Sequence, residues 1–160
     1  MKILMATMGL GIGGAETHIV ELSKELKKQG HDVAIVSNGG VYVAEVTAAG
    51  IRHYQAPLNR RSLPDMLRSW KILEQVIRQE RPDVVHAHAR IPAFLCGKLR
   101  RKLGFVFITS CHGVYQAGGV LKWLSDWGQH TLAVSEDIRD YLKEQYQIPD
   151  ERITLTINGI

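Results

Sequence analysis

The chain has 160 residues, of which 45% are apolar and 22% are charged, and its formal net charge is +4. This length suits one domain with a substantial core, and the ordinary composition excludes a fibrous, low-complexity or disordered chain. No apolar run approaches the roughly 20 residues of a membrane-spanning helix, and the two cysteines, Cys96 and Cys111, are too few for a disulfide framework. We therefore expect one reduced, cytoplasmic domain over residues 1–160.

Segments typical of strands alternate with segments of helical periodicity along the chain. The expected strands are Ile3–Thr7, His31–Ser37, Ile51–Tyr54, Asp83–His88, Phe105–Cys111, Thr131–Val134 and Ile153–Ile157. The expected helices are Ala15–Gln29, Val43–Ala49, one from Pro64 that stops before Pro82, Ile91–Leu103 and one capped by Ser135. Val120–Trp127 is expected to be a short amphipathic segment. Strands that are apolar on both faces need cover on both sides, so we predict a doubly wound, mostly parallel α/β sheet of Rossmann-like type.

Ligands of such folds bind beyond the carboxyl ends of the strands, where the first loop here is rich in glycine. Gly9, Gly11 and Gly14 match the G-x-G-x-x-G pattern between a strand and a helix, which predicts backbone N–H groups close to a phosphate or a sugar hydroxyl. A nicotinamide site also needs an acid about 20 residues later, but the second strand ends in the acid-free run Val36–Gly40. An NAD(P)-binding oxidoreductase domain therefore stays as an alternative.

Four polar residues near strand or helix ends are further candidates. Glu16 lies in the first helical turn, where it either complements the helix dipole or contacts a substrate hydroxyl. His86 and His88 project to one face of their strand, and we expect His86 to be a core residue and His88 a ligand contact. His112 is a candidate ligand contact rather than a base for Cys111, because strand neighbours point to opposite faces. We expect no metal site.

Six segments, taken together and in order, resemble the N-terminal half of the retaining GT-B glycosyltransferases of family 4. They are "GGAETHIVELSKEL", "GHDVAIVS", "PDVVHAHARIPAFLCGKL", "ITSCHGV", "AVSEDIRDYL" and "ITLTINGI". The resemblance implies a nucleotide-sugar donor, UDP- or GDP-linked, as substrate, and a glycan or lipid-linked acceptor of the cell envelope. It implies no metal and no other cofactor.

The resemblance also implies roles for individual residues. Gly13 and Gly14 would lie against the donor diphosphate or the acceptor, with Glu16 beside them. His112 would contact the transferred sugar, His88 would line the acceptor side, and Ser135 would lie at a helix N-terminus beside the cleft. Members of this family have a C-terminal nucleotide-sugar-binding domain that this chain lacks, so we predict that the 160 residues fold alone but do not catalyse transfer.

The basic residues leave further possibilities open. Arg60, Arg61 and Arg68, with the basic helix face of Lys98, Arg101 and Lys102, favour anionic partners. A noncatalytic sugar-binding or membrane-docking module, held peripherally at the inner face of an anionic membrane, is one alternative. A nucleotide-sugar epimerase of the same architecture is another. We expect no nucleic-acid partner.

Overall fold

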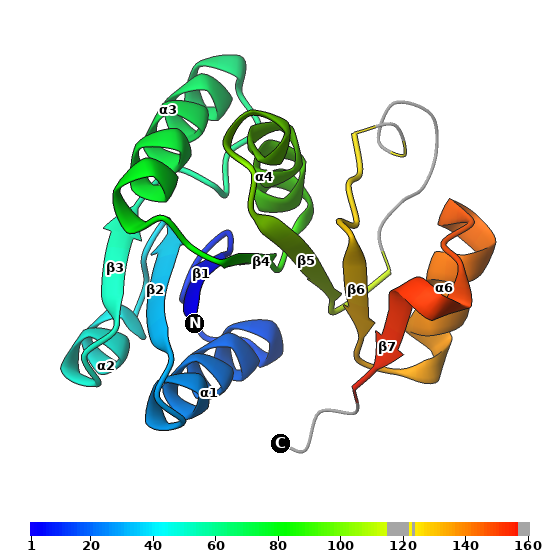
Figure 1. The fold of residues 1–160 in the computed structure, drawn as a ribbon, viewed down its shortest axis with the longest axis horizontal. Coiled ribbons are helices and arrows are strands. Elements are labelled where there is room, and N and C mark those ends of the chain that lie inside the picture. The colour runs from blue at the N-terminus through cyan, green and yellow to red at the C-terminus, as the bar shows by residue number, and fades with distance from the viewer. Residues whose placement is uncertain (115–121, 123, 157–160) are drawn as a thin grey trace.

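Seven parallel strands form one sheet in the order β3-β2-β1-β4-β5-β6-β7 in the computed structural model, which describes residues 1–114, 122 and 124–156 (Figure 1). The strands are β1 (Lys2–Ala6), β2 (Asp32–Ser37), β3 (Arg52–Gln55), β4 (Val84–Ala87), β5 (Val106–Cys111), β6 (His130–Ala133) and β7 (Ile153–Leu155). Each expected strand is present, and its ends lie within two residues of the predicted ends. The predicted parallel α/β architecture is confirmed.

Helices connect the strands and cover the sheet on both faces. They are α1 (Gly14–Lys28), α2 (Val43–Ala48), α3 (Leu63–Glu80), α4 (Arg90–Leu103) and α6 (Glu136–Tyr146), followed by a 3₁₀ turn at Asp150–Arg152. Ser62 and Ser135 cap α3 and α6, because each hydroxyl accepts a hydrogen bond from a backbone N–H in the first turn. Of the expected amphipathic segment Val120–Trp127, residues 120, 121 and 123 lie outside the described residues, and residues 125–127 are not helical.

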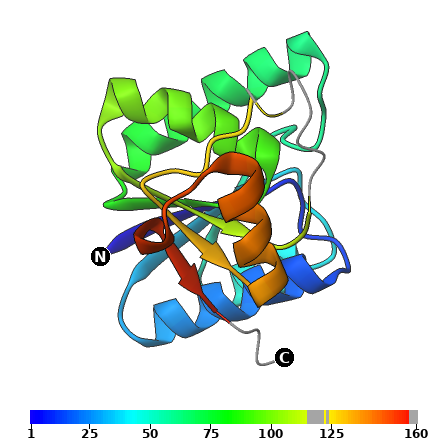
Figure 2. The ribbon, with the colours of Figure 1, turned by 90° about the vertical axis from the view of Figure 1, so that its right-hand side faces the viewer.

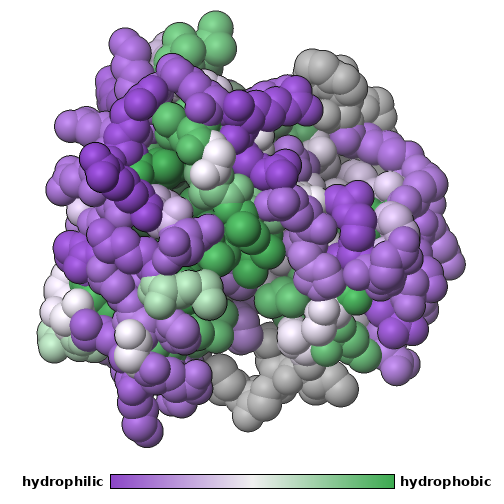
Figure 3. Space-filling view, viewed as in Figure 1, coloured by the Kyte–Doolittle hydropathy of each residue, from purple (hydrophilic) through white to green (hydrophobic). Residues whose placement is uncertain are grey.

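The two faces of the sheet have separate cores because successive strand residues point to opposite sides. In β1, Leu4 and Ala6 pack in the core beneath α3 and α4, whereas Met5 packs with residues of α1. Figure 2 shows the layer that contains α1 on one side of the sheet and the layer of α3 and α4 on the other. The outer surfaces of the helices are mostly hydrophilic, with a band of hydrophobic side chains toward the middle of the face seen in Figure 3.

The strand order places the sheet's switch point between β1 and β4. From β1 the chain crosses to β2 and β3 on one side, and β4 to β7 follow on the other. At such a point the two connections diverge and leave a crevice at the carboxyl edge. The glycine-rich loop after β1 and the residues after β4 therefore lie together at this edge.

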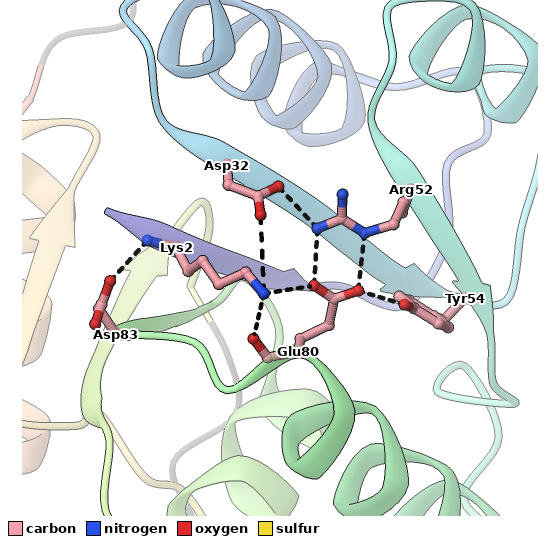
Figure 4. A network of polar contacts seen from close by, with 6 residues as sticks. All are labelled: Lys2, Asp32, Arg52, Tyr54, Glu80 and Asp83. Atoms are coloured by element: carbon pink, nitrogen blue, oxygen red, sulfur yellow. Dashed lines mark hydrogen bonds and ion pairs between the residues drawn. The ribbon is translucent and has the colours of Figure 1, made fainter.

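The opposite, amino edge of the sheet is held by a polar network (Figure 4). Glu80, the last residue of α3, receives two hydrogen bonds of 2.8 Å from Arg52, and Arg52 also donates to Asp32 at 2.8 Å. Tyr54 donates to the same Glu80 carboxylate, and the Lys2 ammonium lies 3.7 Å from it. The network ties the starts of β1, β2 and β3 to the end of α3. It therefore stabilises the fold at the edge remote from the switch point.

Both cysteines are buried in the core. Burial raises the pKa of the Cys96 thiol to about 12 and that of the Cys111 thiol to about 11. Cys111 Sγ lies 3.1 Å from the Gly113 carbonyl oxygen, which it contacts as a weak donor. The thiols are therefore protonated at neutral pH, and the interpretation of both cysteines as small buried hydrophobes is confirmed.

Candidate functional site

The glycine-rich loop after β1 is held in place by the loop after β2. The Leu10 N–H donates to the Gly39 carbonyl at 2.9 Å, and the Tyr42 N–H donates to the Leu10 carbonyl at 3.0 Å. Gly40 has a φ of 147°, and a Cβ atom at this position would lie 2.4 Å from the Leu10 carbonyl carbon. The end of β2, where a dinucleotide-binding domain carries its acid, therefore serves here to brace the glycine loop.

The first turn of α1 brings a carboxylate over its own N-terminus. Gly13 is the N-terminal flanking residue, in extended conformation, and its carbonyl accepts from the Thr17 hydroxyl at 2.8 Å. A Cβ atom on Gly13 would lie 2.2 Å from Glu16 Oε2, so the absence of a side chain at Gly13 makes room for the Glu16 carboxylate. At Gly14 a Cβ atom would meet nothing within 4 Å. The Glu16 charge thus complements the helix dipole, and Gly14 leaves open space beside it.

An open hollow of about 620 Å³ lies at the carboxyl ends of β1, β5 and β6. Its lining residues are Ile12, Gly13, Gly14, Ala15, Thr17, His18, His112 and Val134. This volume falls within the range of small-molecule sites, and the lining combines apolar surface with two imidazoles and the N-terminus of a helix. We refer to this hollow as the histidine hollow.

Four histidines form a row that runs from this hollow into the protein. The ring centroids of His18 and His112 are 5.3 Å apart, those of His112 and His88 are 5.5 Å apart, and those of His88 and His86 are 4.0 Å apart. His88 Nδ1 lies 3.2 Å from His112 Nε2, and His86 Nε2 lies 2.7 Å from Ser110 Oγ. The row thus begins at two rings that face the hollow and ends at two that are almost fully buried.

Burial keeps this row of imidazoles neutral. Desolvation lowers the pKa of His86 to about 3 and that of His112 to about 4, with a smaller contribution from neighbouring histidines. It also lowers the pKa of His88 far below its usual range, and it lowers the pKa of the half-buried His18. A neutral imidazole offers one donor and one acceptor. The hollow therefore presents hydrogen-bonding rings suited to hydroxyl groups rather than a cationic site.

A second, smaller hollow of about 220 Å³ includes the start of the glycine-rich loop in its lining. Its lining residues are Met8, Arg61, Met66, Ala89, Arg90, Ile91, Phe94 and Leu124. Met8 belongs to the same loop whose later residues line the histidine hollow, so both hollows lie against this loop. We refer to this mostly apolar space, which has two arginines in its lining, as the apolar hollow.

The structure brings most of the predicted site residues together. Gly13, Gly14 and His112 line the histidine hollow, and Glu16 lies beside it over Gly13. His88 is only 3% exposed and lies behind His112, so its side chain contacts that ring rather than open space. Ser135 caps α6 next to Val134, which lines the hollow. His86 is buried and bonded to Ser110, which confirms the expectation that it is a core residue.

His18 is a site residue that the sequence analysis missed. It lies four residues after Gly14 in α1, and residues at this spacing occupy the same face of a helix one turn apart. This spacing was a usable signal, since it places His18 above the same surface as the glycine. Its contact with His112, in contrast, joins residues 94 positions apart and depends on the tertiary structure.

The described part of the chain contains neither a metal-binding cluster nor a membrane-spanning helix. Among residues 1–114, 122 and 124–156, no three His, Cys, Asp or Glu side chains are arranged to hold a metal ion. No helix within those ranges combines the length and apolar character that a bilayer span needs.

Comparisons with known proteins agree with the observed fold. The family model of glycosyltransferase family 4 matches residues 12–160. The gpi3 subunit of the phosphatidylinositol N-acetylglucosaminyltransferase of Schizosaccharomyces pombe is 24% identical over 166 residues, which cover 92% of this chain and 36% of the yeast protein. The crystal structure of a glycosyltransferase from Rickettsia africae superposes with a TM-score of 0.81 at 25% identity over 99% of this chain and 43% of that one.

A third similarity is to the Anabaena protein HepE, solved in complex with UDP-glucose, with a TM-score of 0.79 at 13% identity over 99% of this chain and 44% of that protein. The chain thus spans less than half the length of each of these three proteins. The family model, in contrast, extends over all but the first 11 residues of the chain. The chain therefore belongs to glycosyltransferase family 4.

Proposed function

We propose that this chain forms the acceptor-side half of a retaining glycosyltransferase that transfers a sugar from a nucleotide-sugar donor to a glycan or lipid acceptor. The observation that carries the proposal is the histidine hollow, in which the N-terminus of α1 and the neutral rings of His18 and His112 meet at the carboxyl ends of three strands. Family membership supports this function, as do the UDP-glucose bound by HepE and the activity named for the yeast relative.

The histidine hollow would receive the sugar end of the donor. His112 would contact a hydroxyl of the transferred sugar, and the Gly13–Gly14 backbone would lie next to the donor diphosphate or the acceptor. Of these two, the Glu16 carboxylate over Gly13 disfavours the anionic diphosphate and favours an acceptor hydroxyl, which can donate to it. Catalysis would then depend on orientation of the two substrates and on stabilisation of the leaving diphosphate rather than on a protein base or a metal ion.

The apolar hollow would receive part of the acceptor. Met8, Met66, Ile91 and Phe94 supply apolar contact, and Arg61 supplies a cation that has no ion pair among the residues that the structure describes. An acceptor with an apolar portion and an anionic group, such as a lipid phosphate, fits this combination. Because the same loop lines both hollows, a bound acceptor would lie close to the donor sugar.

Binding of donor analogues to the isotope-labelled chain tests the donor-side proposal. We expect UDP-glucose, UDP-N-acetylglucosamine or GDP-mannose to shift the NMR signals of Gly13, Gly14, His18 and His112. The affinity should be millimolar, because the 160 residues span less than half the length of the proteins that they resemble. If none of the three nucleotide sugars shifts these signals, the donor-side proposal is wrong. Saturable shifts with NAD instead would support the oxidoreductase alternative.

A matched pair of glycine variants makes this test specific. Gly14→Ala adds a methyl group in the lining of the histidine hollow, and Gly11→Ala adds one outside it; neither Cβ atom would meet anything within 4 Å. Alanine also suits the helix at position 14, so we expect unchanged or slightly higher stability. We expect Gly14→Ala to weaken nucleotide-sugar binding about tenfold, or roughly 1.4 kcal/mol, and Gly11→Ala to leave it unchanged. Equal affinities of both variants would contradict the placement of the donor.

We also propose a peripheral membrane contact at the start of α3. Leu63 and Leu67 are 71% and 55% exposed, lie one helical turn apart and are flanked by Arg60, Arg61 and Arg68. Exposed leucines beside arginines are typical of helices that lie in an anionic membrane surface. We expect co-sedimentation with vesicles that contain phosphatidylglycerol, a loss of binding at high salt and a loss in the Leu63→Ser, Leu67→Ser double variant. Val106→Ser, at an exposed position at the amino edge of the sheet, is the control.

A further inference from the structure

Met5, His88 and His112 form a short chain of polar contacts that ends in the histidine hollow. His88 Nε2 lies 3.4 Å from Met5 Sδ, and His88 Nδ1 lies 3.2 Å from His112 Nε2. Met5 and His88 are buried, whereas His112 is partly exposed and lines the hollow. Among the residues that the structure describes, nothing hydrogen-bonds to the remaining ring nitrogen, His112 Nδ1.

Each contact in this chain needs one donor and one acceptor, and each neutral ring carries a single N–H. The thioether sulfur of Met5 has no hydrogen and acts only as an acceptor. An attractive contact between His88 and Met5 therefore places the His88 proton on Nε2. His88 Nδ1 is then an acceptor, so the proton between the two rings belongs to His112 Nε2. His112 has no second proton, and its Nδ1 carries a lone pair.

The opposite arrangement of protons leaves a buried nitrogen without a partner. If His88 Nδ1 donated to His112, His88 Nε2 would carry no proton. Its lone pair would then point at a lone pair of the Met5 sulfur, and neither atom could donate a hydrogen bond to the other. A buried acceptor without a donor is costly, by about 1–3 kcal/mol. His112 Nδ1 is open to solvent in both arrangements, so it does not alter this comparison. The contact with Met5 decides between the two.

We propose that Met5 and His88 are positioning residues that hold His112 in its Nε2–H tautomer, so that His112 Nδ1 accepts a hydrogen bond from a ligand hydroxyl. This inference rests on the proposed function of the histidine hollow as the site of the donor sugar. It adds a specificity rule, because the group opposite His112 must be a hydrogen-bond donor. A sugar with fluorine in place of that hydroxyl can accept but not donate, and it would bind as poorly as the deoxy sugar.

The tautomer itself is measurable without any ligand. Long-range proton–nitrogen NMR spectra of the histidine-labelled chain at pH 7.5 distinguish a protonated ring nitrogen from one with a lone pair. We expect Nε2 to be protonated and Nδ1 to carry the lone pair in both His88 and His112. A protonated Nδ1 in either ring would overturn the proposal, whatever the chain binds.

A methionine variant tests the role of the sulfur. Met5→Leu keeps a similar volume but removes the acceptor, so neither tautomer of His88 retains a partner at Nε2. We expect the His112 spectrum to change to a mixture of tautomers, and the affinity for UDP-glucose to fall about twofold because only part of the population is competent. Ile35→Leu, at a buried position of the same core that makes no hydrogen bond or ring contact with His88, is the control.

The outcomes separate this proposal from the proposed function. A wild-type spectrum with the expected tautomers, together with no binding of nucleotide sugars, would contradict only the function. An unchanged tautomer in folded Met5→Leu would show that the sulfur does not position the rings. If Met5→Leu does not fold, the wild-type spectrum and the comparison of deoxy and fluoro donor sugars still decide, since better binding of the fluoro analogue would mean that His112 donates.

Discussion

Gly40 lies against the backbone of Leu10 so closely that a Cβ atom would stand 2.4 Å from the Leu10 carbonyl carbon and 2.6 Å from the Gly11 nitrogen. These residues follow different strands, and their contact joins the loop after β2 to the glycine-rich loop after β1. The Leu10 N–H and carbonyl also bond to Gly39 and Tyr42 on either side. The shape of the histidine hollow therefore depends on a glycine that lies outside it.

The first prediction concerns this contact. Gly40→Ala should destabilise the chain by at least about 3 kcal/mol, because the added methyl overlaps backbone atoms and a φ of 147° strains a side chain. Gly30→Ala is the control, since Gly30 also has a positive φ but open space around it, and there we expect about 1–2 kcal/mol. Denaturant unfolding measures both. Equal losses would mean that the contact with Leu10 does not constrain the loop.

The second prediction concerns Glu80 at the amino edge. The hydrogen bonds from Arg52 hold the pKa of the Glu80 carboxyl at about 2, below its unfolded value of about 4.5. Because the folded pKa is the lower one, the stabilisation is complete above pH 4.5 and is lost as the pH falls toward 2. Glu80→Gln should lower the free energy of unfolding at pH 7 by about 2 kcal/mol, and the difference from wild type should shrink below pH 4.5.

Urea unfolding at pH 7, 5, 4 and 3 would measure this difference. Glu144→Gln, at an exposed position of α6, is the control and should follow the wild-type curve. A Glu80→Gln variant as stable as wild type at pH 7 would show that the network contributes nothing to the fold.

The third prediction concerns the histidine row. The folded pKa of His86 is about 3 and that of His112 about 4, both below the unfolded value of 6.5, so the unfolded chain binds more protons between these limits. Stability should therefore fall as the pH is lowered from 7 to 4, by up to about 1.4 kcal/mol per pH unit for each histidine that stays neutral. The pH range of this effect lies mostly above the range in which Glu80 loses its stabilisation. His112→Asn should reduce the dependence of the unfolding free energy on pH by about 1.4 kcal/mol per pH unit, which corresponds to one proton. A wild-type unfolding free energy that does not change between pH 7 and 5 would contradict the conclusion that these histidines stay neutral in the folded chain.

The fourth prediction concerns activity. The 160 residues alone should release no measurable nucleotide from UDP- or GDP-linked sugars in the presence of lipid or glycan acceptors, because the chain supplies only one wall of the proposed cleft. A coupled assay for free UDP and GDP checks this, after cooperative thermal unfolding has shown that the chain is folded. Robust turnover by the purified chain would refute it and would mean that the histidine hollow is a complete active site.

Much of the architecture followed from short-range patterns. Apolar runs and helical periodicity located all seven strands and the helices α1, α2, α3, α4 and α6, because these signals arise within one or two turns of the chain. The position of the glycine-rich loop between β1 and α1, and the cap at Ser135, were predictable for the same reason. The alternation of strands and helices was enough to indicate a parallel sheet, and the parity of His86 and His88 placed them on one face.

The arrangement of the site was decided by the tertiary structure. His18, His88 and His112 are brought together only when β4 and β5 pair and α1 packs beside them, and the bracing of Leu10 by Gly40 requires the crossover to β2. Burial, which keeps these rings neutral, is likewise a property of the packed protein. The sequence by itself determined which elements form and which loops lie at the carboxyl edge. Only the fold decided which side chains meet there, because strand order and helix packing join residues that no local pattern relates.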